Sequence, residues 1–240
     1  MEKNVLLDNI AAIYKIEEDF DSVLLNYNLK VISFYFKGNI FLELGTSGLS
    51  TKLLLPYASC IDVVEASKVN IEKAKQMVDN NCITFYLSLW EKFNYPVQKY
   101  TDIIWLRGME HIEAPEKILQ RLRTALVKKG RLHIVVPNAL SLHRRLGTYM
   151  KLIKEPHELS ERDKKFGHVK VYDRFQVTQL LIEVGYHVFA WEGIFLKPLP
   201  NAKMLLLYKE NPKLIDALYK IGKELPDYCA EIYICAENSE

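Results

Sequence analysis

The stretch FLELGTSGLSTKLL, residues 41 to 54, decides the fold, because an apolar run ends in an acid and passes at once into a helical pattern. Gly45 follows the run, and a residue without a side chain lets the backbone turn sharply and approach a ligand closely. The helix that begins near residue 49 adds a partial positive charge at its N-terminus. The stretch therefore predicts a strand, a tight turn and a helix.

Short apolar runs rich in β-branched and aromatic residues recur along the chain, and helix-like segments separate most of them. The runs are NIFLEL, CIDVVE, CITFYL, DIIWLR, RLHIVV, YHVFAW and AEIYICA, which begin at residues 39, 60, 82, 102, 131, 186 and 230. We predict helices at residues 49 to 56, 67 to 79, 115 to 127, 174 to 184 and 211 to 225. Ser67 is a candidate N-cap of the second, and Gly130 follows the third. The alternation predicts an α/β sheet that binds ligands at the carboxyl ends of its strands.

Two further segments stand outside this alternation. Residues 1 to 38 predict one or two helices before the sheet, and residues 139 to 173 are too long for a simple connection. Nine basic side chains face five acidic ones between residues 144 and 174. Either a solvated helical surface or a lid that recruits an anion explains this excess. We expect one domain, residues 1 to 240, with an N-terminal helical cap and a lid-like insertion.

The composition indicates a globular protein, with 240 residues, a net charge of +2 and 49% hydrophobic residues. No basic segment precedes an apolar core at the start, so we expect a cytoplasmic protein without a membrane span. The four cysteines include no Cys-x-x-Cys pair, and we expect reduced thiols and no metal site.

Three ligands compete for the turn at Gly45. A phosphate-binding loop needs Lys before its Ser or Thr, whereas Lys52 comes after that pair. A dinucleotide fingerprint needs glycines where this chain has Ser47 and Ser50. S-adenosylmethionine has no pyrophosphate and tolerates these side chains, and Glu43 supplies an acid near its cationic portion. The sequence favours this third ligand.

Glu65 ends the next run about twenty residues after the turn, where a carboxylate can accept two hydrogen bonds from a ribose diol. NAD and S-adenosylmethionine share this feature, so it indicates a nucleoside-containing ligand without separating them. A second interpretation is that Glu65 is an acid at the N-terminus of the helix that follows Ser67.

The segment TDIIWLRGMEHIEAPEKIL, residues 101 to 119, carries a family resemblance. Its Asp102 and apolar run, its Glu110-His111 pair and its Ala114-Pro115 resemble the fourth strand and next helix of class I S-adenosylmethionine-dependent methyltransferases of the small-molecule type. LVKKGRLHIVVPN, GHVKVYDRFQVTQLLIEVGYHV and AEIYICA resemble later elements of the family. The resemblance implies a Rossmann-like seven-stranded mixed sheet, an antiparallel last strand, helices on both faces and S-adenosylmethionine as the cofactor.

The resemblance and the chemistry of the residues together predict the site. The cofactor-binding residues are Glu43, Gly45, Thr46, Gly48, Glu65, Ala66, Ser88, Leu89 and Arg107. His111 and His168 are the catalytic candidates, because a neutral hydroxyl acceptor requires a general base. Substrate-binding candidates are Arg144, Arg145, Tyr172 and Lys197, which suit an anionic acceptor such as a phosphate or sugar acid.

Rival interpretations remain open. The chain is a methyltransferase for a small polar acceptor, a class that includes phosphate- or sugar-containing anions, or a non-catalytic module that binds S-adenosylmethionine or a nucleoside. An RNA methyltransferase is less favoured, because the chain shows no basic stripe with interleaved aromatic residues. An NAD-dependent oxidoreductase conflicts with the missing glycines. As partners we expect a small-molecule acceptor and no membrane, with nucleic acid disfavoured and a homodimer left open.

Overall fold

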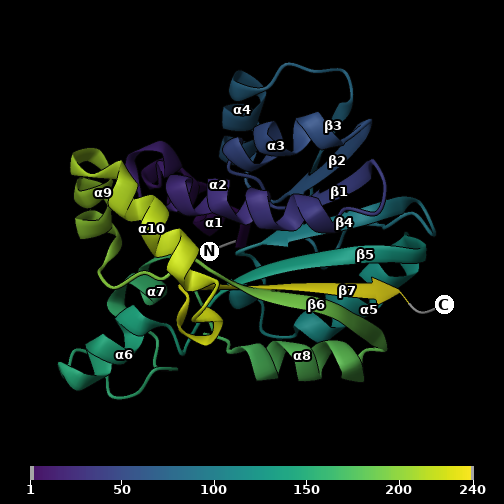
Figure 1. Ribbon diagram of the computed structural model, residues 1–240. Helices are drawn as coiled ribbons and strands as arrows, with labels where there is room; N and C mark the ends of the chain where they lie inside the picture. Colours follow the sequence, from purple (N-terminus) through teal and green to yellow (C-terminus); the bar gives the residue numbers. More distant parts are fainter. Residues whose placement is uncertain (1–2, 239–240) are drawn as a thin grey trace.

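A seven-stranded sheet runs through the centre of the computed structural model, which describes residues 3–238 (Figure 1). The strand order is β3-β2-β1-β4-β5-β7-β6, and β7 runs in the opposite direction to the other six strands. The strands are β1 Ile40–Leu44, β2 Cys60–Glu65, β3 Ile83–Leu87, β4 Tyr100–Leu106, β5 Leu126–Pro137, β6 Tyr186–Ile194 and β7 Glu231–Asn238. The predicted Rossmann-like mixed sheet with an antiparallel last strand is confirmed.

Helices surround this sheet. The α-helices are α1 Lys3–Ile13, α2 Asp21–Ile32, α3 Leu49–Leu54, α4 Lys68–Met77, α5 Pro115–Ala125, α6 Leu142–Tyr149, α7 Glu161–Lys165, α8 Arg174–Glu183, α9 Asn201–Glu210 and α10 Pro212–Gly222. Single 3-10 turns are η1 Ile16–Glu18, η2 Ser33–Tyr35, η3 Leu55–Tyr57, η4 Met109–His111 and η5 Pro226–Tyr228. The five predicted helices correspond to α3, α4, α5, α8 and α10, whereas α9 was not predicted.

Local signals in the sequence explain where several helices begin. The Ser67 hydroxyl accepts a hydrogen bond from the Asn70 N–H at 3.2 Å, which confirms it as the N-cap of α4. The predicted end of α5 was wrong by two residues. Its helix stops at Ala125, because β5 begins at Leu126 and pairs there with Tyr100 of β4. Gly130 consequently lies inside β5 rather than in a turn after the helix.

The core fills both faces of the sheet, as a parallel sheet with apolar strands requires. One face packs against α5 and α8 through residues such as Leu122 and Leu181, which are fully buried. The other face packs against α2, α3, α9 and α10, and buried residues there include Leu29, Leu54 and Ile215. Helices α6 and α7 of the predicted insertion lie near the edge where the parallel strands end (Figure 1).

The structure bears on three sequence predictions about the whole chain. None of the helices between residues 3 and 238 combines the length and apolarity that crossing a bilayer requires. All the cysteines are free thiols, as expected. Residues 1, 2, 239 and 240 of the predicted single domain lie outside the described residues, and the division into domain, cap and lid stays a prediction.

A fully buried carboxylate fastens the N-terminal segment to the sheet. Asp102 in β4 accepts hydrogen bonds from the N–H groups of Lys37 and Gly38 at 2.8 and 2.9 Å. His133 Nε2 lies 2.9 Å from the same carboxylate, and His133 Nδ1 lies 2.8 Å from the Tyr233 hydroxyl. His133 is therefore a packed residue of the sheet, as its place within a strand indicates.

Removing this carboxylate will destabilise the fold. We expect Asp102→Ala to lower the free energy of unfolding by about 3–5 kcal/mol, because two backbone N–H groups and a histidine lose a buried partner. Urea denaturation at neutral pH measures the change. The exposed Asp79→Ala serves as the control and should alter stability by less than about 0.5 kcal/mol. Equal midpoints and slopes for Asp102→Ala and wild type would contradict the assignment.

Candidate functional site

The turn after β1 takes the conformation that its glycines allow. Gly45 has a φ of 76° and Gly48 a φ of 78°, values in the left-handed region that favours glycine. A Cβ atom built on Gly45 would lie 3.0 Å from Cζ2 of Trp90 and 3.8 Å from Oε2 of Glu65. The turn therefore faces the end of β2 and the loop after β3.

Side-chain hydroxyl groups make the hydrogen bonds that hold this turn. The Thr46 hydroxyl accepts a hydrogen bond from the Gly48 N–H at 2.8 Å and lies 2.6 Å from the Thr51 hydroxyl. Thr51 in turn donates to Oε2 of Glu43 at 2.6 Å. Burial raises the pKa of Glu43 to about 7, while the Ser50 and Thr51 hydroxyls oppose the rise. Thr46 and Thr51 thus connect the turn to the acid beneath it.

Glu65 holds the turn and the next helix together. Its Oε2 accepts a hydrogen bond from the Thr46 N–H at 3.0 Å, and its Oε1 accepts one from the Ser67 N–H at 2.7 Å. Burial raises the pKa of this carboxyl group, and the two N–H groups oppose that rise. Each carboxylate oxygen has a second lone pair, so the group can still accept further hydrogen bonds. Both interpretations of Glu65 therefore remain compatible with its contacts.

The predicted adenine-side residues lie at the ends of β2 and β3. The Ser88 N–H donates to the carbonyl of Glu65 at 3.0 Å, and the Ser88 hydroxyl donates to the carbonyl of Leu89 at 3.0 Å. Ala66 is buried beside them. The structure brings these three residues together with the Gly45 turn, although it engages the Ser88 hydroxyl locally.

Trp90 reaches across this edge. Its indole Nε1 donates to the carbonyl of Val64 at 2.9 Å, and its ring lies perpendicular to Trp105 with centroids 5.6 Å apart. A Cβ atom on Gly108 would lie 2.8 Å from Cη2 of Trp90. Trp90 therefore borders both the Gly45 turn after β1 and the Gly108 segment after β4.

Helix α1 covers the start of α4. The Ser67 hydroxyl donates to Asp8 Oδ1 at 2.6 Å, and this hydrogen bond lowers the pKa of Asp8. Lys73 of α4 donates from its Nζ to the carbonyls of Ala11 and Tyr14 at 2.6 and 3.1 Å. The N-terminal segment thus packs beside the Glu65 end of the site, and the sequence showed no signal for these contacts.

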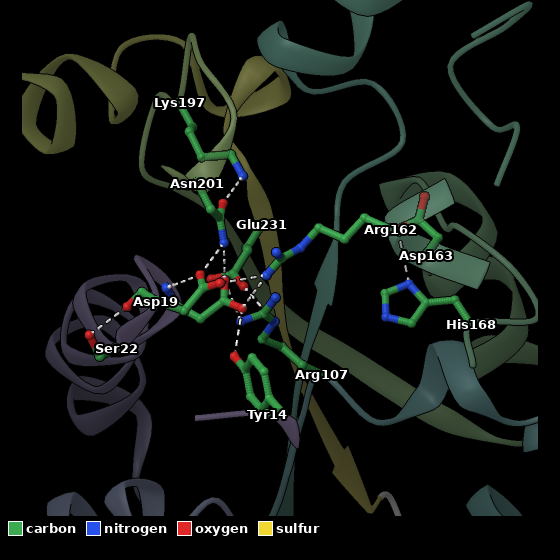
Figure 2. Close-up of polar contacts among 11 residues, drawn as sticks. Tyr14, Asp19, Ser22, Arg107, Arg162, Asp163, His168, Lys197, Asn201 and Glu231 are labelled. Atoms are coloured by element: carbon green, nitrogen blue, oxygen red, sulfur yellow. Dashed lines mark hydrogen bonds and ion pairs between the residues drawn. The ribbon is translucent and has the colours of Figure 1, made fainter. Parts of the chain in front are cut away.

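On the other side of the site, Arg107 lies in a charge network around the buried carboxylates of Asp21 and Glu231 (Figure 2). Its guanidinium lies 2.9 Å from Asp21 and 3.2 Å from Glu231. Burial would raise the pKa of Asp21, but Arg107 and the Tyr14 hydroxyl hold it well below its usual range. The structure thus engages Arg107 with these carboxylates, and its predicted contact with a cofactor stays a prediction.

Segments from the end of the chain and from the insertion join this network. Asn201 of α9 donates to Asp19 and Asp21 at 2.6 and 2.7 Å, and accepts a hydrogen bond from Lys197 Nζ at 2.7 Å (Figure 2). Burial lowers the pKa of Lys197 to about 8, which the Asp21 charge opposes. Arg162 of α7 lies 2.9 Å from Asp19. Of this network, only Arg107 and Lys197 were predicted from the sequence as site residues.

The two predicted catalytic histidines meet directly after β4. The rings of His111 and His168 lie 4.7 Å apart, nearly perpendicular to one another. Burial lowers the pKa of His111, and burial raises that of its neighbour Glu110 to about 7. Tyr172 is buried, and burial together with the charge of Glu110 raises its pKa to about 12. The predicted groups from the fourth strand and the insertion thus share one end of the sheet.

Arg144 and Arg145 have contacts that fold the insertion. Arg144 is buried, donates from Nε to the carbonyl of Pro156 at 2.7 Å and pairs with Asp163 at 3.0 Å. Arg145 donates to the carbonyl of Leu140 at 2.8 Å and lies over the Tyr228 ring. Asp163 also lies 3.2 Å from Nδ1 of His168, so Arg144 is joined to the histidine pair through this shared carboxylate. The predicted contacts of both arginines with a substrate stay predictions.

Comparisons with known proteins fit this geometry. The family model described as a methyltransferase domain matches residues 25–190. No curated protein sequence matches the chain. Many solved structures share the fold.

Three of these structures show how far the likeness extends. An S-adenosylmethionine-dependent methyltransferase from Mesorhizobium loti is 13% identical with a TM-score of 0.62, over 87% of this chain and 95% of that chain. A complex between the Haloferax volcanii Trm112 methyltransferase activator and a protein described as a methyltransferase gives 11% identity and a TM-score of 0.68, over 100% of both chains. Phosphoethanolamine N-methyltransferase 2 from Haemonchus contortus is 14% identical with a TM-score of 0.62, over 90% of this chain and 53% of that chain. At these identities the likeness establishes the fold.

The raised pKa of Glu43 generates a prediction about stability. The Glu43 carboxyl group has its ordinary pKa of 4.5 in the unfolded chain and a pKa of about 7 in the folded protein. Between these pH values the folded state keeps a proton that the unfolded state has lost. Wild type therefore loses stability as pH rises from about 4.5 to about 7. We expect Glu43→Gln to match wild type near pH 4.5 and to exceed it by up to about 3 kcal/mol at pH 8.

Urea denaturation of both proteins across this pH range measures the difference. Glu72→Gln, an exposed change on α4, is the control and should leave the pH profile of wild type unchanged. A difference between Glu43→Gln and wild type that stays constant with pH would show that Glu43 ionises normally in the fold.

Proposed function

The chain belongs to the methyltransferase domain family of S-adenosylmethionine-dependent enzymes, and on that premise we propose that it methylates a small polar acceptor. The observation that carries the proposal is the convergence of the Gly45 turn and the Glu65 carboxylate at the carboxyl edge of the sheet. The acceptor, in this proposal, lies beside His111 and His168 after β4.

The residues at the turn fit S-adenosylmethionine. Gly45 presents a backbone without a side chain to Trp90 and Glu65, and Glu65 retains lone pairs for a ribose diol. We assign Glu65 to the ribose, the turn and Glu43 to the methionine portion, and Ala66, Ser88 and Leu89 to the adenine. When bound, this cofactor supplies a methyl group that its sulfonium has already activated. The protein's own task is to orient the acceptor and exclude water.

On the acceptor side we assign proton transfer to the histidine pair. Because burial lowers the pKa of His111, its imidazole is neutral at neutral pH and can accept a proton from a hydroxyl acceptor. Tyr172 is buried near Glu110 and can donate a hydrogen bond to a polar acceptor. An amine that arrives unprotonated would not need the base, so the pair favours a hydroxyl acceptor.

The partners of Arg144 and Lys197 bear on whether the acceptor is anionic. Asp163 pairs with Arg144, and Asn201 accepts a hydrogen bond from Lys197, so these two cations already have protein partners. An anionic acceptor would consequently depend on Lys197 changing its partner or on a cation bound with the acceptor. The name of the Haemonchus contortus relative describes a phosphate-bearing acceptor, and we include that class in the proposal.

The first test concerns the cofactor alone. We expect Glu65→Gln to raise the dissociation constant of S-adenosylhomocysteine about 10- to 100-fold, because an uncharged amide replaces a carboxylate that accepts hydrogen bonds. Isothermal titration calorimetry measures this constant. Glu72→Gln on the exposed face of α4 should bind as wild type does. Equal binding by Glu65→Gln, with an unchanged circular dichroism spectrum, would assign Glu65 to the helix terminus alone.

The second test concerns the reaction. Formation of S-adenosylhomocysteine is followed with panels of small hydroxyl, amine and phosphate-bearing acceptors and with RNA. We expect turnover with a small polar acceptor, and a fall in kcat of about 100-fold or more for His111→Asn. His157→Asn, which changes a histidine that pairs with Asp173 instead, should retain wild-type turnover.

The outcomes of this second test separate the rival functions. Binding of S-adenosylhomocysteine without turnover in any panel would favour the non-catalytic module. Turnover on RNA alone would replace the small acceptor by a macromolecule.

A further inference from the structure

Glu110, His111 and His168 bring three groups that can bind a metal ion into one cluster. Glu110 and His111 lie in η4 directly after β4, whereas His168 comes from the insertion. One ligand atom from each residue lies within 4.8 Å of the others. The pattern of cysteines in the sequence predicted no metal site, and it gave no sign of a cluster formed by residues so far apart along the chain.

The Nδ1 atom of each imidazole has a hydrogen-bond acceptor nearby. Nδ1 of His111 lies 3.2 Å from the carbonyl oxygen of Gly167, and Nδ1 of His168 lies 3.2 Å from the Asp163 carboxylate. Both partners can only accept a hydrogen bond, which favours the proton on Nδ1 and the lone pair on Nε2 of each ring. The contact of His168 with Asp163 is an ion-pair distance without hydrogen-bond geometry. Carbonyl and carboxylate groups commonly orient metal-binding histidines in this way.

Glu110 supplies the observation that calls for a cation. The side chain is 1% exposed, and within residues 3–238 neither of its carboxylate oxygens has a hydrogen-bond partner. A buried carboxylate without partners is costly, whereas a carboxylate bound to a metal is not. The nearby Arg107 is already paired with Asp21 and Glu231. A cation beside Glu110 would therefore satisfy oxygens that the protein leaves without donors.

Backbone hydrogen bonds hold the cluster in place. The Val169 N–H donates to the carbonyl of Glu110 at 2.8 Å, and the His168 N–H donates to the carbonyl of Asp163 at 2.9 Å. Gly167 makes the turn between these two bonds with a φ of 76°. The segment that carries His168 is thus tied to the segment that carries Glu110, so the three side chains do not depend on a flexible lid to meet.

We propose that Glu110, His111 and His168 bind a divalent transition metal ion. Two imidazoles and one carboxylate suit Zn²⁺, Fe²⁺, Mn²⁺ or Co²⁺, whereas Mg²⁺ and Ca²⁺ prefer oxygen ligands. Three protein ligands leave coordination positions for water or for an oxygen of the acceptor. A hydroxyl at such a position has a lowered pKa, and an anionic oxygen there meets a cation.

Metal binding does not require the proposed methyltransferase function, whereas a role for the ion in holding an acceptor rests on it. With an ion on its Nε2, His111 no longer accepts a proton, and the lowered pKa of a metal-bound hydroxyl replaces the base that we assigned to His111. The ion would supply the unpaired positive charge that Arg144 and Lys197 do not. It also accounts for a buried acid next to two histidines at the end of β4, which the binding of S-adenosylmethionine leaves unexplained.

The experiment uses the full chain, freed of any affinity tag and treated with a chelator, and Co²⁺ as the probe. Visible absorption and isothermal titration calorimetry follow its addition, without cofactor or acceptor. We expect one equivalent of Co²⁺ to bind with ligand-field bands in the visible, and Zn²⁺ to displace it. Glu110→Gln and His168→Asn should each weaken binding by about 100-fold or more. The control His157→Asn, a histidine that pairs with Asp173, should bind Co²⁺ as wild type does.

Two results would overturn the proposal. One is wild-type protein that shows neither visible bands nor heat of binding, and the other is Co²⁺ binding that Glu110→Gln and His168→Asn leave unchanged. Circular dichroism and thermal melting identify a variant that fails to fold, and His111→Asn then takes its place. S-adenosylhomocysteine binding is measured on the same samples, so that failure of the cofactor site and failure of the metal site are distinguished.

Discussion

The carboxyl edge of the sheet depends on the pairing of the partly exposed Arg107 guanidinium with two buried carboxylates. Arg107 follows β4 with a φ of 52°, a conformation that residues other than glycine rarely adopt, and its N–H donates to Val135 at 2.7 Å. Asp21 at the start of α2 and Glu231 at the start of β7 neutralise it. Loss of the cation would leave two buried carboxylates unpaired, which is costly, so these three elements are held in one arrangement.

That arrangement positions the segments on either side of it. Asn201 of α9 and Arg162 of α7 bind the same acidic residues, which draws the C-terminal helices and the insertion toward the end of β4 (Figure 2). Gly108 and η4 follow Arg107 directly. Gly108 borders Trp90, and η4 carries Glu110 and His111. The network around Arg107 thereby brings the proposed cofactor and acceptor regions together. Its positive and negative charges are paired with one another.

Sequence reasoning succeeded for elements that local interactions define. The central strands β1, β2 and β4 were predicted because their apolar runs are buried on both faces, and α4 because Ser67 caps it. It failed for α9, which follows closely spaced prolines and has no strongly apolar face. Tertiary contacts stabilise that helix, since Met204 is fully buried and Asn201 binds Asp19 and Asp21. Similarly, α5 ended early because pairing of Leu126 with β4 outweighed its helical pattern.

The sequence by itself determined the sheet, the glycine turn and the place of Glu65, because each depends on neighbours along the chain or on strand order. It also identified His111, beyond the end of β4, and His168, on the insertion, as candidates to face an acceptor. Only the tertiary structure decided that these histidines meet at Glu110, that Arg107 faces Asp21 and Glu231, and that Arg144 folds the insertion. Those partners are far apart in sequence, and the burial that makes each unpaired charge costly arises only when the chain has folded.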